Sequence, residues 1–279
     1  METDLRMRVF AGPNGSGKST IIKEVSNFKT HKGKLLDFGY YINADDIAVA
    51  LTKNKFSFDN YGINFIENEF VEVVHQSGLL GQVFKAEAFL ASFKTNGNKL
   101  TLKASQSNER LAQIIADFLR KKLLIEQKKF SFETVFSHPS KLDIMRQAKE
   151  AGYKVYLYFV STESPEINKG RVYYRKKMGG HDVPVDKIES RYFRSLELLQ
   201  PASDLSYQVY FFDNSENDSP FKLIAHFKMN GEQKEWDEIT EVQIPNWFKK
   251  YYLQKAPKKI AQKILIRTKQ PYFKFNFNK

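Results

Sequence analysis

Residues 11–20 read AGPNGSGKST, and within them the segment from Gly12 to Ser19 matches the complete G-x-x-x-x-G-K-[ST] pattern of a phosphate-binding loop. The run MRVFAG before it favours a β-strand, and KSTIIKEV after it favours a helix, which is the context that this motif requires. Glycines let backbone N–H groups approach a phosphate, and the helix directs its positive end toward the same point. The stretch therefore predicts a nucleoside triphosphate site.

The polar residues of this loop have expected roles in binding ATP and Mg²⁺. Lys18 can reach the β- and γ-phosphate oxygens, and Ser19 can ligate Mg²⁺. The residues expected to bind the nucleotide are Gly12, Asn14, Gly15, Ser16, Gly17, Lys18, Ser19 and Thr20.

Strand-like and helix-like segments alternate after the loop. The expected strands include YYINA (40–44), KKFSFETVF (128–136), KVYLYFVS (154–161) and QVYFFDNS (208–215). Strongly helical segments lie between them, among them ERLAQIIADFLRKKLL (109–124). This alternation predicts a three-layer α/β fold of the P-loop NTPase or kinase kind, with a mainly parallel sheet.

One large domain with appendages is the organisation that we expect. The kinase-like domain covers residues 1–220, and the less regular stretch 54–104 is an insertion with a helix and a small hairpin. Residues 221–279 form a basic C-terminal extension that begins with an added strand and turn.

Charge and composition restrict the compartment and the partners. The chain of 279 residues has a net charge of +12. Ten Lys and Arg residues and no Asp or Glu follow Glu241. The rest of the chain, with 44 − 10 = 34 basic against 32 acidic residues, is therefore nearly neutral. The basic tail can bind RNA, an acidic partner or a membrane surface, or its aromatic residues can pack on the main domain. The absence of cysteine excludes disulfides and favours the cytoplasm. We expect no membrane span and no secretory signal.

Missing motifs narrow the class of nucleotide protein. The chain has no N-K-x-D for reading guanine, no H-R-D loop of protein kinases and no LSGGQ-like transporter signature. A small-molecule or nucleotide kinase remains, which needs a carboxylate to activate an acceptor hydroxyl and arginines to neutralise the transferring phosphoryl. Asp45 follows a predicted strand, and Glu133 lies at the end of another, after FSF, where a parallel sheet presents residues to a ligand. Asp46 is the rival of Asp45, and either residue could instead cap the helix that follows.

Taken in order, several segments resemble zeta-toxin-like P-loop kinases. These segments are GPNGSGKST, YINADDIA, FSFETVFS, AKEAGYKVYLYFVS, GRVYYRKKMGGHDVP, SRYFRSLELL and FFDNS. The resemblance covers roughly residues 6–215, with 54–104 as a departure. It implies ATP-dependent phosphorylation of a sugar hydroxyl of UDP-N-acetylglucosamine or a similar nucleotide sugar, by a toxin that a small helical antitoxin holds in check.

The resemblance also assigns roles to individual residues. It makes Asp45 the catalytic base, and it makes Glu133 the substrate-holding glutamate together with Thr134. The remaining residues that it implies are Lys18, Arg171, Arg175 and Arg191 at the phosphates, Ser19 at Mg²⁺, and His181 in the GGHDVP loop near the substrate.

One departure leaves the acceptor open. Many relatives read ETT where this chain has Val135, so one hydroxyl contact to the sugar is missing. A kinase of another small metabolite or an antibiotic is therefore an alternative. A further alternative is a nucleotide-dependent RNA-binding protein that uses the basic tail.

Overall fold

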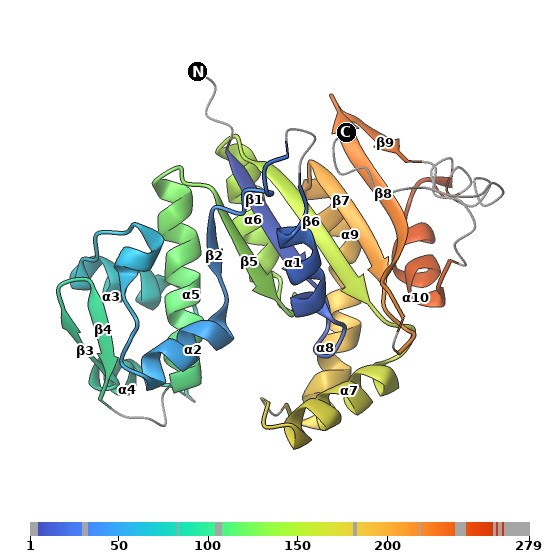
Figure 1. The fold of residues 1–279 in the computed structure, drawn as a ribbon. Helices are drawn as coiled ribbons and strands as arrows, with labels where there is room; N and C mark the ends of the chain where they lie inside the picture. Colours follow the sequence, from blue (N-terminus) through green and yellow to red (C-terminus); the bar gives the residue numbers. More distant parts are fainter. Residues whose placement is uncertain are drawn as a thin grey trace. The chain divides into compact units, whose positions relative to one another are not determined.

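The chain folds into two compact units in the computed structural model (Figure 1). The core unit consists of Met1–Phe38 and Glu133–Lys279, and the inserted unit is Gly39–Phe132. The structure describes residues 5–29, 33–82, 84–103, 108–180, 183–217, 219–237, 244–258, 261 and 264.

A mainly parallel sheet forms the centre of the core unit, in the strand order β1-β6-β7-β8-β9. The first three of these strands are parallel, and the last two are antiparallel. The strands are β1 (Arg6–Ala11), β6 (Lys154–Ser161), β7 (Gln208–Asp213), β8 (Lys222–Asn230) and β9 (Gln233–Trp236). Every residue of β7 is buried, as expected for a strand covered on both faces.

Helices cover both faces of this sheet (Figure 1), which confirms the expected α/β class. Helix α1 packs on one face through Ile21 and Val25, which contact alternate residues of the three parallel strands such as Phe10 and Tyr158. The remaining helices of the core unit are α6 (Ser140–Glu150), α7 (Pro165–Lys177), α8 (Val185–Glu197), α9 (Leu199–Leu205) and α10 (Asn246–Phe248), with α1 at Lys18–Ser26.

The described part of residues 221–279, which we expected as a basic extension with an added strand and turn, belongs to the sheet and its cover. β8 pairs with β7 over most of its length. On the face opposite α1, the ring of Phe211 lies 4.9 Å from the ring of Phe248 and 4.8 Å from the ring of Tyr252. The aromatic residues of α10 and of the π-helical turn Lys249–Leu253 are buried, because they cover this face.

The inserted unit has a core made largely of phenylalanine rings. Phe58 stacks on Phe65 at 4.2 Å, and Phe118 and Phe70 meet edge to face at 5.0 Å. The expected helix and hairpin are present as α3 (Glu67–Gln76) and the pair formed by β3 (Phe93–Asn96) and β4 (Lys99–Leu102). Because α5 (Asn108–Ile125) supplies Phe118 to this core, the unit extends beyond the expected insertion 54–104.

Two parallel strands and four helices complete the inserted unit. β2 pairs with β5 from Tyr40 opposite Phe130 to Ile42 opposite Phe132. The elements are β2 (Tyr40–Ile42), α2 (Ala44–Thr52), a 3-10 turn (Phe58–Tyr61), α3 (Glu67–Gln76), α4 (Ala86–Ala91), β3 (Phe93–Asn96), β4 (Lys99–Leu102), α5 (Asn108–Ile125) and β5 (Phe130–Thr134), whose last two residues belong to the core unit.

The described helices are all too short or too polar to cross a bilayer.

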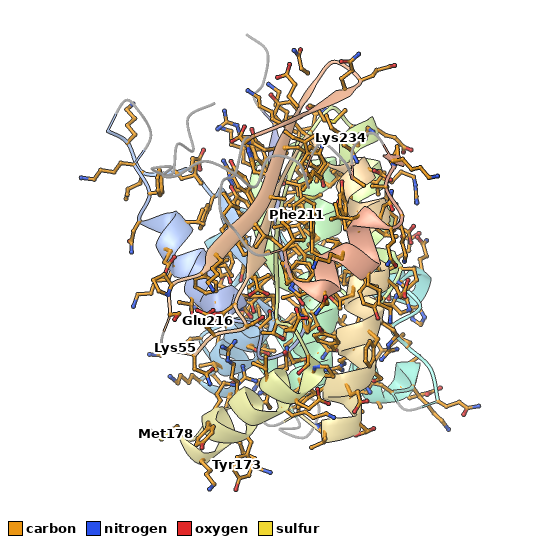
Figure 2. All side chains as sticks on the ribbon, turned by 90° about the vertical axis from the view of Figure 1, so that its right-hand side faces the viewer. Lys55, Tyr173, Met178, Phe211, Glu216 and Lys234 are labelled. Atoms are coloured by element: carbon orange, nitrogen blue, oxygen red, sulfur yellow. The ribbon has the colours of Figure 1, made fainter. Side chains whose placement is uncertain are left out.

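Replacing Phe248 with alanine is expected to lower the free energy of unfolding by about 3–5 kcal/mol, because the fully buried ring leaves a cavity beside Phe211. Tyr173→Ala serves as the control, since Tyr173 is 55% exposed and projects from α7 (Figure 2). Its effect should stay within about 0.5 kcal/mol. Urea denaturation of both variants measures this difference, and equal stabilities would contradict the packing of the C-terminal segment on the sheet.

Candidate functional site

The phosphate-binding loop joins β1 to α1, as the sequence predicts. β1 ends at Ala11, α1 begins at Lys18, and Gly17 between them has a left-handed backbone with φ of 97°. Glycine adopts this conformation without the strain that a side chain would add. No side chain caps the start of α1. The first backbone N–H groups of such a helix can bind an anion.

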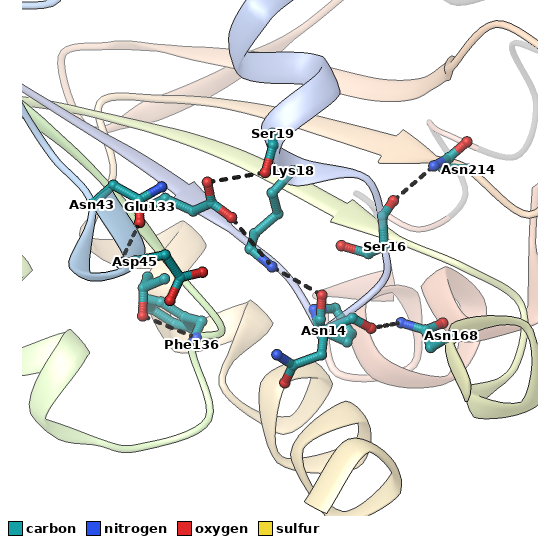
Figure 3. Close-up of polar contacts among 12 residues, drawn as sticks. Asn14, Ser16, Lys18, Ser19, Asn43, Asp45, Glu133, Phe136, Asn168 and Asn214 are labelled. Carbon is teal, nitrogen blue, oxygen red and sulfur yellow. Dashed lines mark hydrogen bonds and ion pairs between the residues drawn. The ribbon is translucent and has the colours of Figure 1, made fainter. Parts of the chain in front are cut away.

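Two asparagine side chains from distant parts of the core unit hold the loop on the side away from Glu133 (Figure 3). Asn168 of α7 donates its Nδ2–H to the carbonyl oxygen of Asn14 at 2.5 Å. Asn214, directly after β7, donates to the carbonyl oxygen of Ser16 at 2.8 Å. Neither asparagine has a role that the sequence predicts, although Asn214 lies in the quoted segment FFDNS.

Lys18, Ser19 and Glu133 come together at the front of the loop (Figure 3). The Lys18 Nζ donates to the carbonyl oxygen of Pro13 at 3.0 Å and lies 3.8 Å from Glu133 Oε1. The Ser19 hydroxyl donates to Glu133 Oε2 at 3.4 Å. Both partners of the ion pair are largely buried, with exposed side-chain fractions of 7% and 16%. Phosphate-binding residues and a strand-end carboxylate therefore share one site.

The donor set at this point fits a hard cation. A hydroxyl and a carboxylate oxygen are ligands that Mg²⁺ accepts when it also binds water and phosphate. The described residues contain no group of three or more His, Cys, Asp or Glu that could hold a metal ion by protein ligands alone. Ser19 and Glu133 are thus suited to a cation that the nucleotide itself helps to bind.

The chain leaves Glu133 through a strained turn. The Thr134 hydroxyl accepts a hydrogen bond from the backbone N–H of Phe136 at 3.2 Å. Phe136 is completely buried and has φ of 59°, a conformation that a bulky residue adopts at a cost of about 1–3 kcal/mol. Such outliers persist where the surrounding structure holds them, and this one fixes the direction in which the chain leaves Glu133.

Arg171 is engaged by the loop after β7. Its guanidinium donates to the carbonyl oxygen of Asn214 at 2.7 Å and to the side chain of Asn217 at 2.9 Å. Burial lowers the pKa of Arg171, and the Asp213 carboxylate opposes this shift. In this arrangement Arg171 supports the loop that holds Ser16.

Of the other expected arginines, Arg175 lies on the same helix as Arg171, and Arg191 lies on the next helix. Arg175 packs at the end of α7 against Gly180, whose N–H donates to the Arg175 carbonyl oxygen at 2.9 Å. Arg191 is half-buried on α8. The expected substrate contact His181 lies outside the described residues.

Asp45 and Asp46 occupy the first turn of α2 in the inserted unit, and both are exposed. The expectation that one of them caps this helix is wrong, because Asn43 is the cap and its Oδ1 accepts from the backbone N–H of Asp45 at 2.8 Å. Burial raises the pKa of Asp46, and the charge of Asp45 raises it further. Both carboxylates are therefore left out of the capping of this helix.

No family model matches the chain, but individual proteins and solved structures are similar to it. A stretch of 63 residues, 23% of the chain, is 36% identical to an uncharacterised protein of Haemophilus influenzae and covers 45% of it. The solved structures that resemble the chain include toxin–antitoxin proteins. One is the PezAT chromosomal toxin–antitoxin system of Streptococcus pneumoniae, 13% identical with a TM-score of 0.42, where the match covers 76% of this chain and 70% of that one.

Another similar structure is AvrRxo1-ORF1 with AvrRxo1-ORF2 and ATP, 15% identical with a TM-score of 0.47. This match covers 85% of the present chain and 61% of that chain. The chain thus spans less than half of the Haemophilus protein and about three fifths of the AvrRxo1 chain. The likeness is one of fold and extends to no particular substrate.

Gly17→Ala is expected to weaken ATP binding at least about tenfold, which corresponds to about 1.4 kcal/mol. A Cβ at Gly17 would lie 2.3 Å from Asn214 Nδ2, on a backbone with φ of 97°. Gly170→Ala is the matched control, because it lies within α7 and its Cβ would meet nothing within 4 Å. This control should stabilise the protein by about 0.5–1 kcal/mol and keep its affinity for ATP. Calorimetric titration with ATP measures both, and equal affinities would show that the loop tolerates the clash.

Proposed function

We propose that the chain is an ATP-dependent kinase that transfers the γ-phosphoryl group to a hydroxyl of a small molecule. The observation that supports this most is the meeting of Lys18, Ser19 and Glu133 in front of a complete phosphate-binding loop. A cation, a hydroxyl and a carboxylate at this point provide what a phosphoryl-transfer site needs at its phosphate end.

Lys18 and the backbone of the loop bind the phosphates in this proposal. The Lys18 ammonium exchanges the Pro13 carbonyl oxygen for phosphate oxygens, and α1 directs its positive end at them. Ser19 and Glu133 would hold Mg²⁺, directly or through water, and the ion would neutralise part of the phosphate charge. Glu133 therefore has a metal-binding role in this proposal. This role is additional to the substrate contact that the family resemblance implies for Glu133 and Thr134.

Asp45 is the general base in this proposal. Its carboxylate accepts the proton of the acceptor hydroxyl as that oxygen forms its bond to the γ-phosphorus, and the bond to the bridging oxygen breaks to leave ADP. Two observations support Asp45: its match to the NAD segment of the resembled family, and its freedom from helix capping, which Asn43 performs. Arg175, Arg191 and His181 are the proposed contacts to the phosphates and the acceptor.

A nucleotide sugar of the UDP-N-acetylglucosamine kind is the first proposed acceptor, and the action is that of a toxin with a small helical antitoxin. The motif order shared with zeta-toxin-like kinases supports this proposal, and cytoplasmic precursors of the cell wall fit the absence of cysteine. Another metabolite is the second candidate, because Val135 lacks the hydroxyl that many relatives place at this position.

Incubation of the purified protein with ATP, Mg²⁺ and a panel of UDP-sugars, followed by mass spectrometry, tests the proposal. One sugar should gain a single phosphate group while ADP accumulates. Lys18→Ala should abolish the product, because the γ-phosphoryl loses the nearest cation. A product that forms equally with this variant would exclude the proposed site, and a phosphate gained only by a different metabolite would favour the second candidate.

Asp45→Asn should lower the rate of transfer by about 10²–10⁴-fold, the usual contribution of a general base. Asp46→Asn is the matched control in the same helical turn and should be mild. ATP affinity should change little in either variant, since the phosphate-binding loop is intact. Single-turnover transfer and ATP titration measure both effects. If Asp46→Asn is the inactive variant, Asp46 is the base; if both stay active, the chain does not use this mechanism.

A further inference from the structure

The C-terminal segment Asn246–Leu253 contacts two carboxylates at the ends of core strands: Asp213 is the last residue of β7, and Glu163 lies two residues after β6. The indole N–H of Trp247 donates to Asp213 Oδ1 at 2.8 Å, and both residues are buried. The backbone N–H of Asn246 donates to the Glu163 carboxylate at 3.0 and 3.2 Å, and its side-chain amide donates to the same group at 2.5 Å. Each contact is a hydrogen bond to a carboxylate, the stronger class of protein hydrogen bond.

Ser215 links the Asp213 carboxylate to the backbone of Glu163. Its hydroxyl donates to Asp213 Oδ1 at 2.8 Å, and its backbone N–H donates to Asp213 Oδ2 at 3.2 Å. The same hydroxyl accepts from the backbone N–H of Glu163 at 2.8 Å. The loops after β6 and β7 are therefore joined through one serine, and the C-terminal segment holds both.

The joined loops also hold the phosphate-binding loop. Asn214 lies between Asp213 and Ser215 in sequence, and it donates to the Ser16 carbonyl oxygen. Arg171 donates to the Asn214 carbonyl oxygen and so fixes the same residue from α7. Trp247 therefore hydrogen-bonds to Asp213, and Asn214, the next residue in the chain, hydrogen-bonds to the loop that would bind the nucleotide.

We propose that Trp247 and Asn246 are positioning residues of the nucleotide site, because they hold the loops that place Asn214 on Ser16. The inference rests on the nucleotide binding of the proposed function, and it does not depend on the acceptor. The C-terminal segment then has a second role besides covering the sheet. By holding Asp213 and Glu163 in place, it raises the affinity for nucleotide.

Trp247→Phe in the full chain tests the proposal, because phenylalanine keeps a ring beside Phe159 and removes the indole donor. The expected result is about tenfold weaker binding of ATP, the loss that corresponds to one charged hydrogen bond. Tyr252→Phe is the control in the same segment: it also removes one polar group and keeps a buried ring, but its hydroxyl contacts Lys234, 3.5 Å away. This control should bind ATP like the wild type.

Asn246→Ala removes the side-chain donor to Glu163 without enlarging the core and should also weaken ATP binding. ATP affinity is measured by calorimetry below the melting temperature of every variant, so that a loss of stability alone does not change the result. Equal affinities in the wild type, Trp247→Phe and Asn246→Ala would overturn the proposal. Phosphoryl transfer is a separate readout. ATP binding as predicted without transfer to any acceptor would contradict the kinase proposal alone. A wild type that binds no ATP would contradict both proposals.

Discussion

The close approach of Asn214 to the phosphate-binding loop is the constraint on which the core unit depends. The amide reaches the Ser16 carbonyl oxygen only because position 17 has no Cβ, since a methyl group there would lie 2.3 Å from the amide nitrogen. The motif glycine therefore serves the protein's own packing as well as a phosphate. The same loop is held by Asn168 from another helix, so its shape is set by two residues far away in sequence. Such a loop is formed before a ligand arrives, which reduces the cost of ordering it on binding.

Glu133 shows how a single side chain can connect the parts of such a site. It lies near the end of β5, whose first three residues are buried, and the Thr134–Phe136 turn fixes the chain that leaves it. Its carboxylate meets a cation and a hydroxyl of the phosphate-binding loop. A shorter carboxylate at this position would lack one methylene of reach, and an amide would lose the charge that holds the lysine.

The sequence was sufficient for the parts of the structure that local patterns determine. The phosphate-binding motif, the alternation of strands and helices, and the hairpin at Gly97 each follow from residues that are neighbours in the chain. The two asparagine contacts span 154 and 198 residues, so no local signal contains them. The cap of α2 was missed because Asn43 precedes two carboxylates that are equally good caps by type. For the tail, the sequence left open whether its aromatic residues pack on the main domain, because the burial of Trp247 and its neighbours depends on the sheet they cover.

The position of the C-terminal segment in the chain has a consequence for synthesis. β1 pairs with β6, whose first residue follows Arg6 by 148 positions (154 − 6), so the parallel sheet forms only when more than half of the chain has been made. One face of that sheet, with Phe159 and Phe211, is covered by rings that are translated later still. A nascent chain that has emerged as far as β9 therefore presents an apolar face to solvent or to a chaperone. Completion of folding, and with it the full support of the phosphate-binding loop, waits for the residues around Trp247.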